Sequence, residues 1–196
     1  GLMVNGNIMI PYSYTMVKRG PKVSYSKQNK GKVLTLSYNG NKIVLYSAQT
    51  NKVWDVIERD GVCYSKEEYV RRKYQESAPI FVTAYSWFVS QMPKYVQKPE
   101  KAEFPYWAFA DLYNVDQSDN ILHLSVPKDE VVFFDAMDWN KIMRLNYIGE
   151  NEAEEKAFFE DMAMRGLNWN DVMLTSFYPV WKKKIMESWN RLFRHH

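Results

Sequence analysis

The sequence has very few residues that could form disulfides or thiolate metal sites. Its 196 residues include one cysteine, Cys63, which excludes an intramolecular disulfide and a zinc site built from several cysteines. Histidine is also scarce, because two of the three are the terminal His195 and His196, which resemble the remnant of a purification tag, and only His123 is internal. We therefore expect no metal site and a cytoplasmic, reducing location.

Long apolar runs and closely spaced glycines are missing as well. The longest apolar runs, residues 43–46 and 131–134, are far shorter than the roughly 18 residues of a membrane span, so we expect a soluble protein without membrane contact. The eight glycines do not show the spacing of a phosphate loop or of a dinucleotide fingerprint. No signal-peptide pattern opens the chain.

The composition that remains is that of a globular domain rich in aromatic residues. Hydrophobic residues make up 46%, charged residues 25% and aromatic residues 16%, which excludes wholesale disorder and coiled-coil rods. Short β-branched runs alternate with helical patterns. We therefore predict an α+β fold with an N-terminal β-meander feeding a mixed or antiparallel sheet, helices packed against it, and a helical C-terminal third.

Strands are expected where short β-branched and aromatic runs stand between turn signals. The pair Asn39-Gly40 is typical of a type I′ hairpin between two of these strands. Pro11 restricts the extended segment of residues 8–17 to an edge or an irregular strand. The predicted strands cover residues 23–26, 32–38, 42–47, 121–126 and 131–134.

Helices are expected where apolar residues recur at helical spacing. Thr50 is placed to cap one of them and Gly61 to end it, whereas the Asp135 carboxylate can cap a helix that follows it. The predicted helices cover residues 51–60, 66–76, 84–92, 152–164 and 169–174, a turn after Asp135, and a final helix from Pro179.

Charge is strongly segregated along the chain. No acidic residue precedes Asp55, whereas residues 100–161 contain fifteen acidic residues and five basic ones. Such blocks indicate separate faces for separate partners, or two faces that attract one another in the fold. Tyrosines interleaved with lysines suit stacking and phosphate contacts with single-stranded nucleic acid, although tyrosine is also a good strand former. The candidate nucleic-acid contacts are Lys18, Arg19, Lys22, Lys27, Lys30 and Lys32.

Two internal side chains could take part in proton transfer or nucleophilic chemistry. His123 alternates with Leu122 and Leu124 and is therefore expected on the opposite face of its strand, as a structural histidine or as a general base. Cys63 follows a helix-ending glycine, a position more typical of a small buried apolar residue than of a nucleophile.

Several short motifs, in order and spacing, resemble the bacterial domain-of-unknown-function family 3841. This resemblance runs from about Ile43 to Phe193 and implies no activity. We accordingly predict a basic, β-rich extension over residues 1–42 and a family-like α+β domain over residues 43–196. The motifs are Leu45-Tyr46-Ser47-Ala48-Gln49-Thr50, Trp54, Gly61, Ala84-Tyr85-Ser86-Trp87-Phe88, Gln91-Met92, Pro105-Tyr106-Trp107-Ala108, Phe134-Asp135 with Trp139, and Glu187-Ser188-Trp189-Asn190-Arg191-Leu192-Phe193.

Residues 43–50, followed by a helix and Gly61, are also similar to the opening of ADP-ribosyltransferase-like domains. In those domains a polar strand-end residue grips the adenosine ribose of NAD, and Ser47 stands at that position here, with Gln49 nearby. No Glu-x-Glu occurs in residues 131–135, so the resemblance implies binding of NAD or a related nucleotide more than it implies transfer. The implied substrate-binding residues are Ser47, Gln49, Thr50, Tyr85, Gln91, Trp107 and Asp135.

A non-catalytic binding module is the alternative hypothesis. In this interpretation the basic N-terminal residues before Asp55 engage nucleic acid, or the acidic residues within 100–161 engage a protein partner. The process served is phage defence or counter-defence. The shortage of histidine favours this alternative, whereas the polar strand ends favour a nucleotide site.

Overall fold

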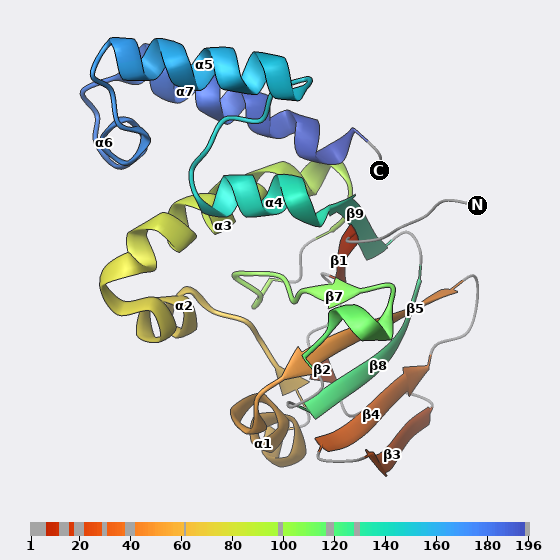
Figure 1. Ribbon diagram of the computed structural model, residues 1–196. Coiled ribbons are helices and arrows are strands. Elements are labelled where there is room, and N and C mark those ends of the chain that lie inside the picture. Colours follow the sequence, from red (N-terminus) through yellow and green to blue (C-terminus); the bar gives the residue numbers. More distant parts are fainter. Residues whose placement is uncertain are drawn as a thin grey trace. The chain divides into compact units, whose positions relative to one another are not determined.

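The computed structural model describes residues 7–11, 16–17, 22–28, 31–37, 42–60, 62–97, 100–116, 120–127 and 130–194 (Figure 1). The chain forms two compact units: the first comprises Gly1–Glu67 and Val89–Phe133, and the second comprises Glu68–Phe88 and Phe134–His196. Strands dominate the first unit and helices the second, so the α+β prediction is confirmed. Within the described ranges, no helix is both long enough and apolar enough to cross a membrane.

Seven strands form one mixed sheet, in the order β3-β4-β8-β5-β7-β1-β9, and β2 pairs with β6 in a separate ribbon. Most neighbours whose register is known are antiparallel, but β4 and β8 run parallel. The strands are β1 (Asn7–Pro11), β2 (Met16–Val17), β3 (Lys22–Gln28), β4 (Gly31–Ser37), β5 (Lys42–Gln49), β6 (Val62–Cys63), β7 (Ala108–Phe109), β8 (Asn120–Pro127) and β9 (Val131–Asp135).

The meander predicted for the N-terminal strands forms only in part. β3 and β4 pair as an antiparallel hairpin, but β8 lies between β4 and β5 (Figure 1). The strands on either side of Asn39-Gly40 are therefore not neighbours, and residues 38–41 lie outside the described part of the chain. The physical reason is burial: β8 contributes Leu122 and Leu124, which are almost fully buried, so it takes a central place that a local turn signal does not reveal.

The core of the first unit lies between the sheet and α1 (Asn51–Asp60). Trp54 and Ile57 of this helix are buried in one cluster with Leu45 of β5 and with the two leucines of β8. The helix begins directly after Thr50, whose carbonyl accepts from the Trp54 backbone N–H at 3.2 Å, as the sequence predicts. Two short 3-10 turns, η2 (Met92–Lys94) and η3 (Leu112–Asn114), also belong to this unit.

The second unit is built around aromatic rings. Phe88 packs edge-on against Phe134 and Trp139, with ring centroids 5.2 and 5.3 Å apart, and Trp87 meets Trp189 at 5.3 Å. Phe134 lies on β9, and the other rings come from helical segments placed as the spacing predicts, although the helix with Trp87 already begins at Ala78. The helices in or bordering this unit are α2 (Glu67–Tyr74), η1 (Gln75–Ser77), α3 (Ala78–Gln91), α4 (Ala136–Met143), α5 (Glu152–Met164), α6 (Trp169–Leu174), α7 (Pro179–Ser188) and η5 (Trp189–Phe193).

Candidate functional site

β5 ends in a short chain of polar contacts. Ser47 is 2% exposed, and its hydroxyl donates to the carbonyl of Trp107 at 2.6 Å. Gln49 Nε2 in turn donates to Ser47 Oγ at 2.8 Å. The amide nitrogen of Gln49 is therefore used within its own strand, while no hydrogen bond to its Oε1 occurs among the described residues.

The start of β8 lies beside this chain and joins it to α1. Asn120 is the register partner of Gln49 and is 6% exposed. Its Nδ2 donates to Asn51 Oδ1, on the first residue of α1, at 2.9 Å. Because a buried amide needs a partner, this bond fixes the ends of two strands and the first turn of a helix relative to one another.

The first turn of α1 suits a negatively charged group. It contains no acidic residue, and Lys52 is exposed on it. Backbone N–H groups and the positive end of the helix dipole point out of such a terminus. Together with Gln49 and Asn120, this turn forms what we call the strand-end site.

The other residues implied for this unit have contacts of their own. Thr50 is exposed and Trp107 is half-buried. Gln91 Nε2 donates to Ser90 Oγ at 3.1 Å, and Gln91 Oε1 accepts from Lys94 Nζ at 2.7 Å. Ligand contacts by these residues stay predictions.

Tyr85 and Asp135 belong to the second unit, where each has a packing or capping contact. Tyr85 is 8% exposed and stacks on Trp139 with centroids 5.9 Å apart. The Asp135 carboxylate accepts from the N–H of Met137 at 2.8 Å and of Asp138 at 3.1 Å. It therefore caps α4, as the sequence predicts, and its role in substrate binding stays a prediction.

The candidate nucleic-acid residues are described only in part. Lys18, Arg19 and Lys30 lie outside the described residues. Lys22 and Lys27 lie on β3 and Lys32 on β4, and the register sets Lys27 directly opposite Lys32.

His123 lies on β8 on the face opposite the two buried leucines, as predicted. Its ring meets the Tyr46 ring edge-on at 5.0 Å, and burial lowers the pKa of the imidazole. His123 Nε2 is buried without a hydrogen-bond partner in the part of the chain that the structure describes. Desolvation of this nitrogen therefore favours the neutral ring.

Cys63 is a buried thiol, as its position in the sequence suggests. It is 3% exposed, and the Tyr106 hydroxyl donates to its Sγ at 3.2 Å. Burial raises the pKa of the thiol, which disfavours the nucleophilic thiolate. Among the described residues, no three His, Cys, Asp or Glu side chains converge as metal ligands.

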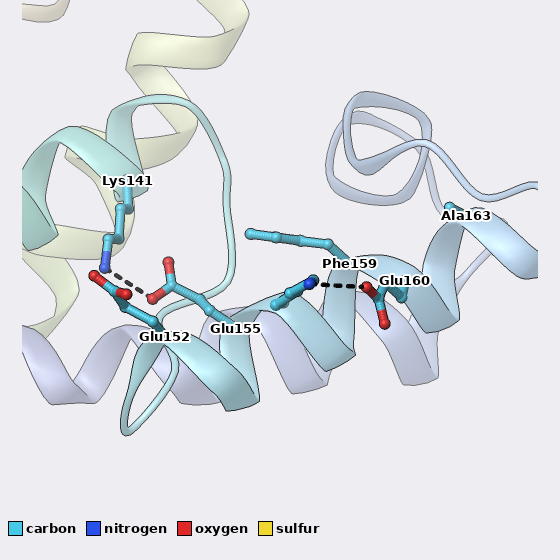
Figure 2. A pocket seen from close by; sticks show the side chains of 7 residues that line it. Lys141, Glu152, Glu155, Phe159, Glu160 and Ala163 are labelled. Atoms are coloured by element: carbon cyan, nitrogen blue, oxygen red, sulfur yellow. Dashed lines mark hydrogen bonds and ion pairs between the residues drawn. The ribbon is translucent and has the colours of Figure 1, made fainter.

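The second unit has a pocket of about 530 Å³ lined by charged residues of α4 and α5. Lys141 reaches from α4 to Glu155 on α5, with Nζ and Oε2 2.9 Å apart (Figure 2). Lys141 also lies 3.6 Å from Asp138, which pairs with Arg194 at 3.0 Å. Because these charged groups pair with one another, they are less available to bind a ligand in the pocket.

Sequence reasoning missed a second charge network, centred on Arg191. Its Nε donates to Glu150 at 3.0 Å, and its Nη1 donates to the carbonyl of Ile148 at 2.5 Å. Nη1 also lies 3.4 Å from Glu154, which accepts from the Tyr147 hydroxyl at 2.5 Å. No sequence pattern links Glu150 or Glu154 to an arginine some forty residues away, which is why the network could not be predicted.

The fold is thus that of an α+β protein with a mixed sheet and a separate helical unit. A family model described as "Domain of unknown function (DUF3841)" matches residues 44–196. The chain belongs to this family, which confirms the first resemblance seen in the sequence. No curated protein and no solved structure matches the chain.

Proposed function

We propose that the first unit binds NAD or a related nucleotide at the strand-end site. The observation that carries the proposal is the junction of β5, β8 and α1, where buried Asn120, the register partner of Gln49, is hydrogen-bonded to the first residue of a helix whose first turn has no acidic residue. A polar group next to the backbone N–H donors of a helix N-terminus is what recognition of a sugar hydroxyl and a phosphate requires.

Each residue of the junction has a distinct role in this proposal. Gln49 Oε1 accepts from a ribose hydroxyl, and an amide does so without titrating. The N–H groups of the first turn of α1, with Lys52, face a phosphate. Ser47 is too deeply buried to reach a ligand, so its hydroxyl holds the Gln49 amide in place.

The proposal concerns binding alone. The similarity to ADP-ribosyltransferase-like domains supports the choice of NAD as probe, and transfer of ADP-ribose stays a prediction from that similarity. In the proposal, Ser47 holds the Gln49 amide in place. The similarity implied instead that Ser47 contacts the ribose itself.

Calorimetric titration with NAD and with ADP-ribose tests the proposal. We expect the parent protein to bind at least one of them and Gln49→Ala to bind about 3- to 10-fold more weakly, the loss of one hydrogen bond. Gln97→Ala is the control, because Gln97 is an exposed glutamine of the same unit that is not among the implied substrate-binding residues. No heat from the parent, or equal affinity in all three proteins, contradicts the proposal.

A second candidate function is binding of single-stranded nucleic acid by the β3–β4 hairpin. The observation that favours it is the register pair Lys27 and Lys32. Two basic residues at opposite register positions of a hairpin supply charge of the sign that a phosphate backbone requires. Because the first 54 residues contain no acid, no nearby carboxylate in sequence competes for these lysines.

A further inference from the structure

Three aromatic residues stand in a row across the sheet of the first unit. Tyr46 of β5 is the register partner of His123 on β8 and of Phe109 on β7, and β5 lies between these two strands. Residues directly opposite one another on neighbouring strands belong to the same face of a sheet. The three rings therefore share one face, and we call them the ring row.

The ring row lies on the face opposite to the core. The chain neighbours Leu45, Leu122 and Ala108 of the three rings are buried in the core cluster that α1 covers, and successive side chains of a strand point to opposite faces. The rings themselves are half-buried. Val44, which shares their face by the same alternation, is 52% exposed. This face is therefore open to solvent beside Tyr46.

His123 differs from the other two residues of the ring row. Its Nε2 is buried, and its ring meets the Tyr46 ring edge-on, with centroids 5.0 Å apart and planes at 85°. This contact orders the Tyr46 ring, and an ordered side chain loses little conformational entropy when it binds a ligand. Tyr46 and Phe109 are thus the rings of the row that suit contact with a ligand.

The strands around the ring row contain basic residues and no acidic ones. β3, β4, β5, β7 and β8 together contain four lysines. The register places Lys22 and Lys42 on the face of the ring row, and Lys27 and Lys32 on the opposite face. The acidic residues of the first unit lie on α1, at Glu67 and in connecting segments, and the unit has fourteen basic and eleven acidic residues in total. The charge on this face therefore suits an anionic ligand.

Hydroxyl-bearing residues occupy much of the remaining face. The register places Ser24 and Ser26 of β3, Thr35 and Ser37 of β4 and Ser125 of β8 on it. Serine and threonine hydroxyls contact phosphate and sugar oxygens in nucleic-acid complexes. Aromatic rings on which bases stack, beside positive charge that follows the backbone, are typical of surfaces that bind single strands.

We propose that the face of the ring row binds single-stranded nucleic acid. The bases stack on the rings of Tyr46 and Phe109, and the phosphates lie near Lys22 and Lys42. This surface is distinct from the two described above, because Gln49 and the lysine pair of the β3–β4 hairpin both belong to the opposite face of the sheet.

The test measures binding of a labelled oligothymidylate to the full chain by fluorescence anisotropy. A length of about 15 nucleotides covers a site of the usual size for a single strand. We expect Tyr46→Leu and Phe109→Leu each to weaken binding about 5- to 100-fold, the effect of losing one stacked base. The slope of log K against log salt should stay the same in both variants, because neither removes a charge.

The control variants separate stacking from charge and from folding. Tyr46→Phe retains the ring and should bind like the parent. Tyr113→Leu should also bind like the parent, because Tyr113 is an aromatic residue of the same unit that is 91% exposed and outside the ring row. Lys22→Gln with Lys42→Gln should instead lower the salt slope by about 0.7 for each lysine. Titration of Tyr46→Leu with NAD should match the parent, since Gln49 lies on the other face.

Three results would overturn the proposal. The absence of oligonucleotide binding by the parent overturns it together with the second candidate function. Binding that Lys27→Gln with Lys32→Gln weakens, but that Tyr46→Leu and Phe109→Leu leave unchanged, overturns this proposal alone and leaves the hairpin as the binding surface. Equal affinity for the single strand and for its duplex also overturns it, because the bases of a duplex are not free to stack on protein rings.

Discussion

Trp189 and Trp107 are both tryptophans of the family-like motifs, yet their environments differ. Trp189 is fully buried, and its indole N–H donates to the Asn146 carbonyl at 2.7 Å. Trp107 is half-buried, and its backbone carbonyl, which any residue would provide, accepts from Ser47. The side chain of Trp189 therefore contributes more to the stability of its unit than that of Trp107.

Replacing these tryptophans should show how much each environment contributes to the free energy of unfolding. Trp189→Ala and Trp87→Ala should each lower the free energy of unfolding by about 3 to 5 kcal/mol, because each loses apolar burial and leaves a cavity. Trp107→Ala should cost less. Urea denaturation of the three variants measures the difference, and a series in which Trp107→Ala is the most destabilised would contradict it.

His123 makes the stability of the first unit depend on pH. Burial lowers the pKa of the folded imidazole below its ordinary value, so below about pH 6.5 the unfolded chain binds the proton more readily than the folded chain. The contribution of His123 to stability is therefore present above this pH and lost as the pH falls through the folded pKa.

An NMR titration of the His123 ring protons tests this expectation. The ring should titrate below about pH 6.5, and His123→Gln should flatten the change in unfolding free energy between that pH and the folded pKa. Titration of His123 above its ordinary value would show that an acidic group, and not burial, dominates its surroundings.

At the scale of elements, the start of α4 depends on one carboxylate. Asp135 accepts from two backbone N–H groups of the first turn. Asp135→Ala should therefore destabilise the protein by about 0.5 to 2 kcal/mol, whereas Asp135→Asn, which also caps helices, should retain most of the stability.

Thermal unfolding of these two variants measures how much the cap contributes to stability. Nucleotide titration of Asp135→Asn tests the substrate-binding role that is also predicted for Asp135. If Asp135→Asn is stable but loses affinity for NAD, the carboxylate takes part in binding as well as in capping. If stability falls equally in both variants, the charge itself, and not the hydrogen-bond geometry, stabilises α4.

For the whole molecule, the basic N-terminal residues cannot simply be deleted to test nucleic-acid binding. β4 is the parallel partner of β8, and β1 pairs with β7. Removing residues 1–41 would take these strands out of the sheet and leave the edge of the buried β8 exposed. Point substitutions are therefore the better experiment, even though residues 1–42 were expected to be an extension.

Lys27→Gln combined with Lys32→Gln should weaken the binding of a single-stranded oligonucleotide and lower the salt dependence of its affinity. Each lost phosphate contact reduces the slope of log K against log salt by about 0.7. Lys94→Gln with Lys101→Gln is the control pair in the same unit, because both lysines are exposed. Equal slopes for the two double variants would contradict a role of the hairpin.

The sequence by itself determined most of the helices and strands of this protein. Helix ends at Thr50, Asp135 and Pro179 could be predicted because capping and apolar periodicity act between residues within a few positions of one another. The buried leucines of β8 and the opposite placement of His123 followed from strand alternation alone. The family of the chain could also be predicted, from the order and spacing of its short motifs.

Tertiary structure alone decided which strands are neighbours and what the polar side chains contact. The placement of β8 between β4 and β5, the bond from Ser47 to Trp107, and the pairing of Arg191 with Glu150 join residues that are between 41 and 88 positions apart. Such pairings depend on which apolar surfaces are buried together, and many pairings fit one local pattern. The ligand contacts of the site residues named from the sequence therefore stay predictions, whereas the bond of Ser47 to Trp107 and the place of Asn120 beside Gln49 required the packed chain.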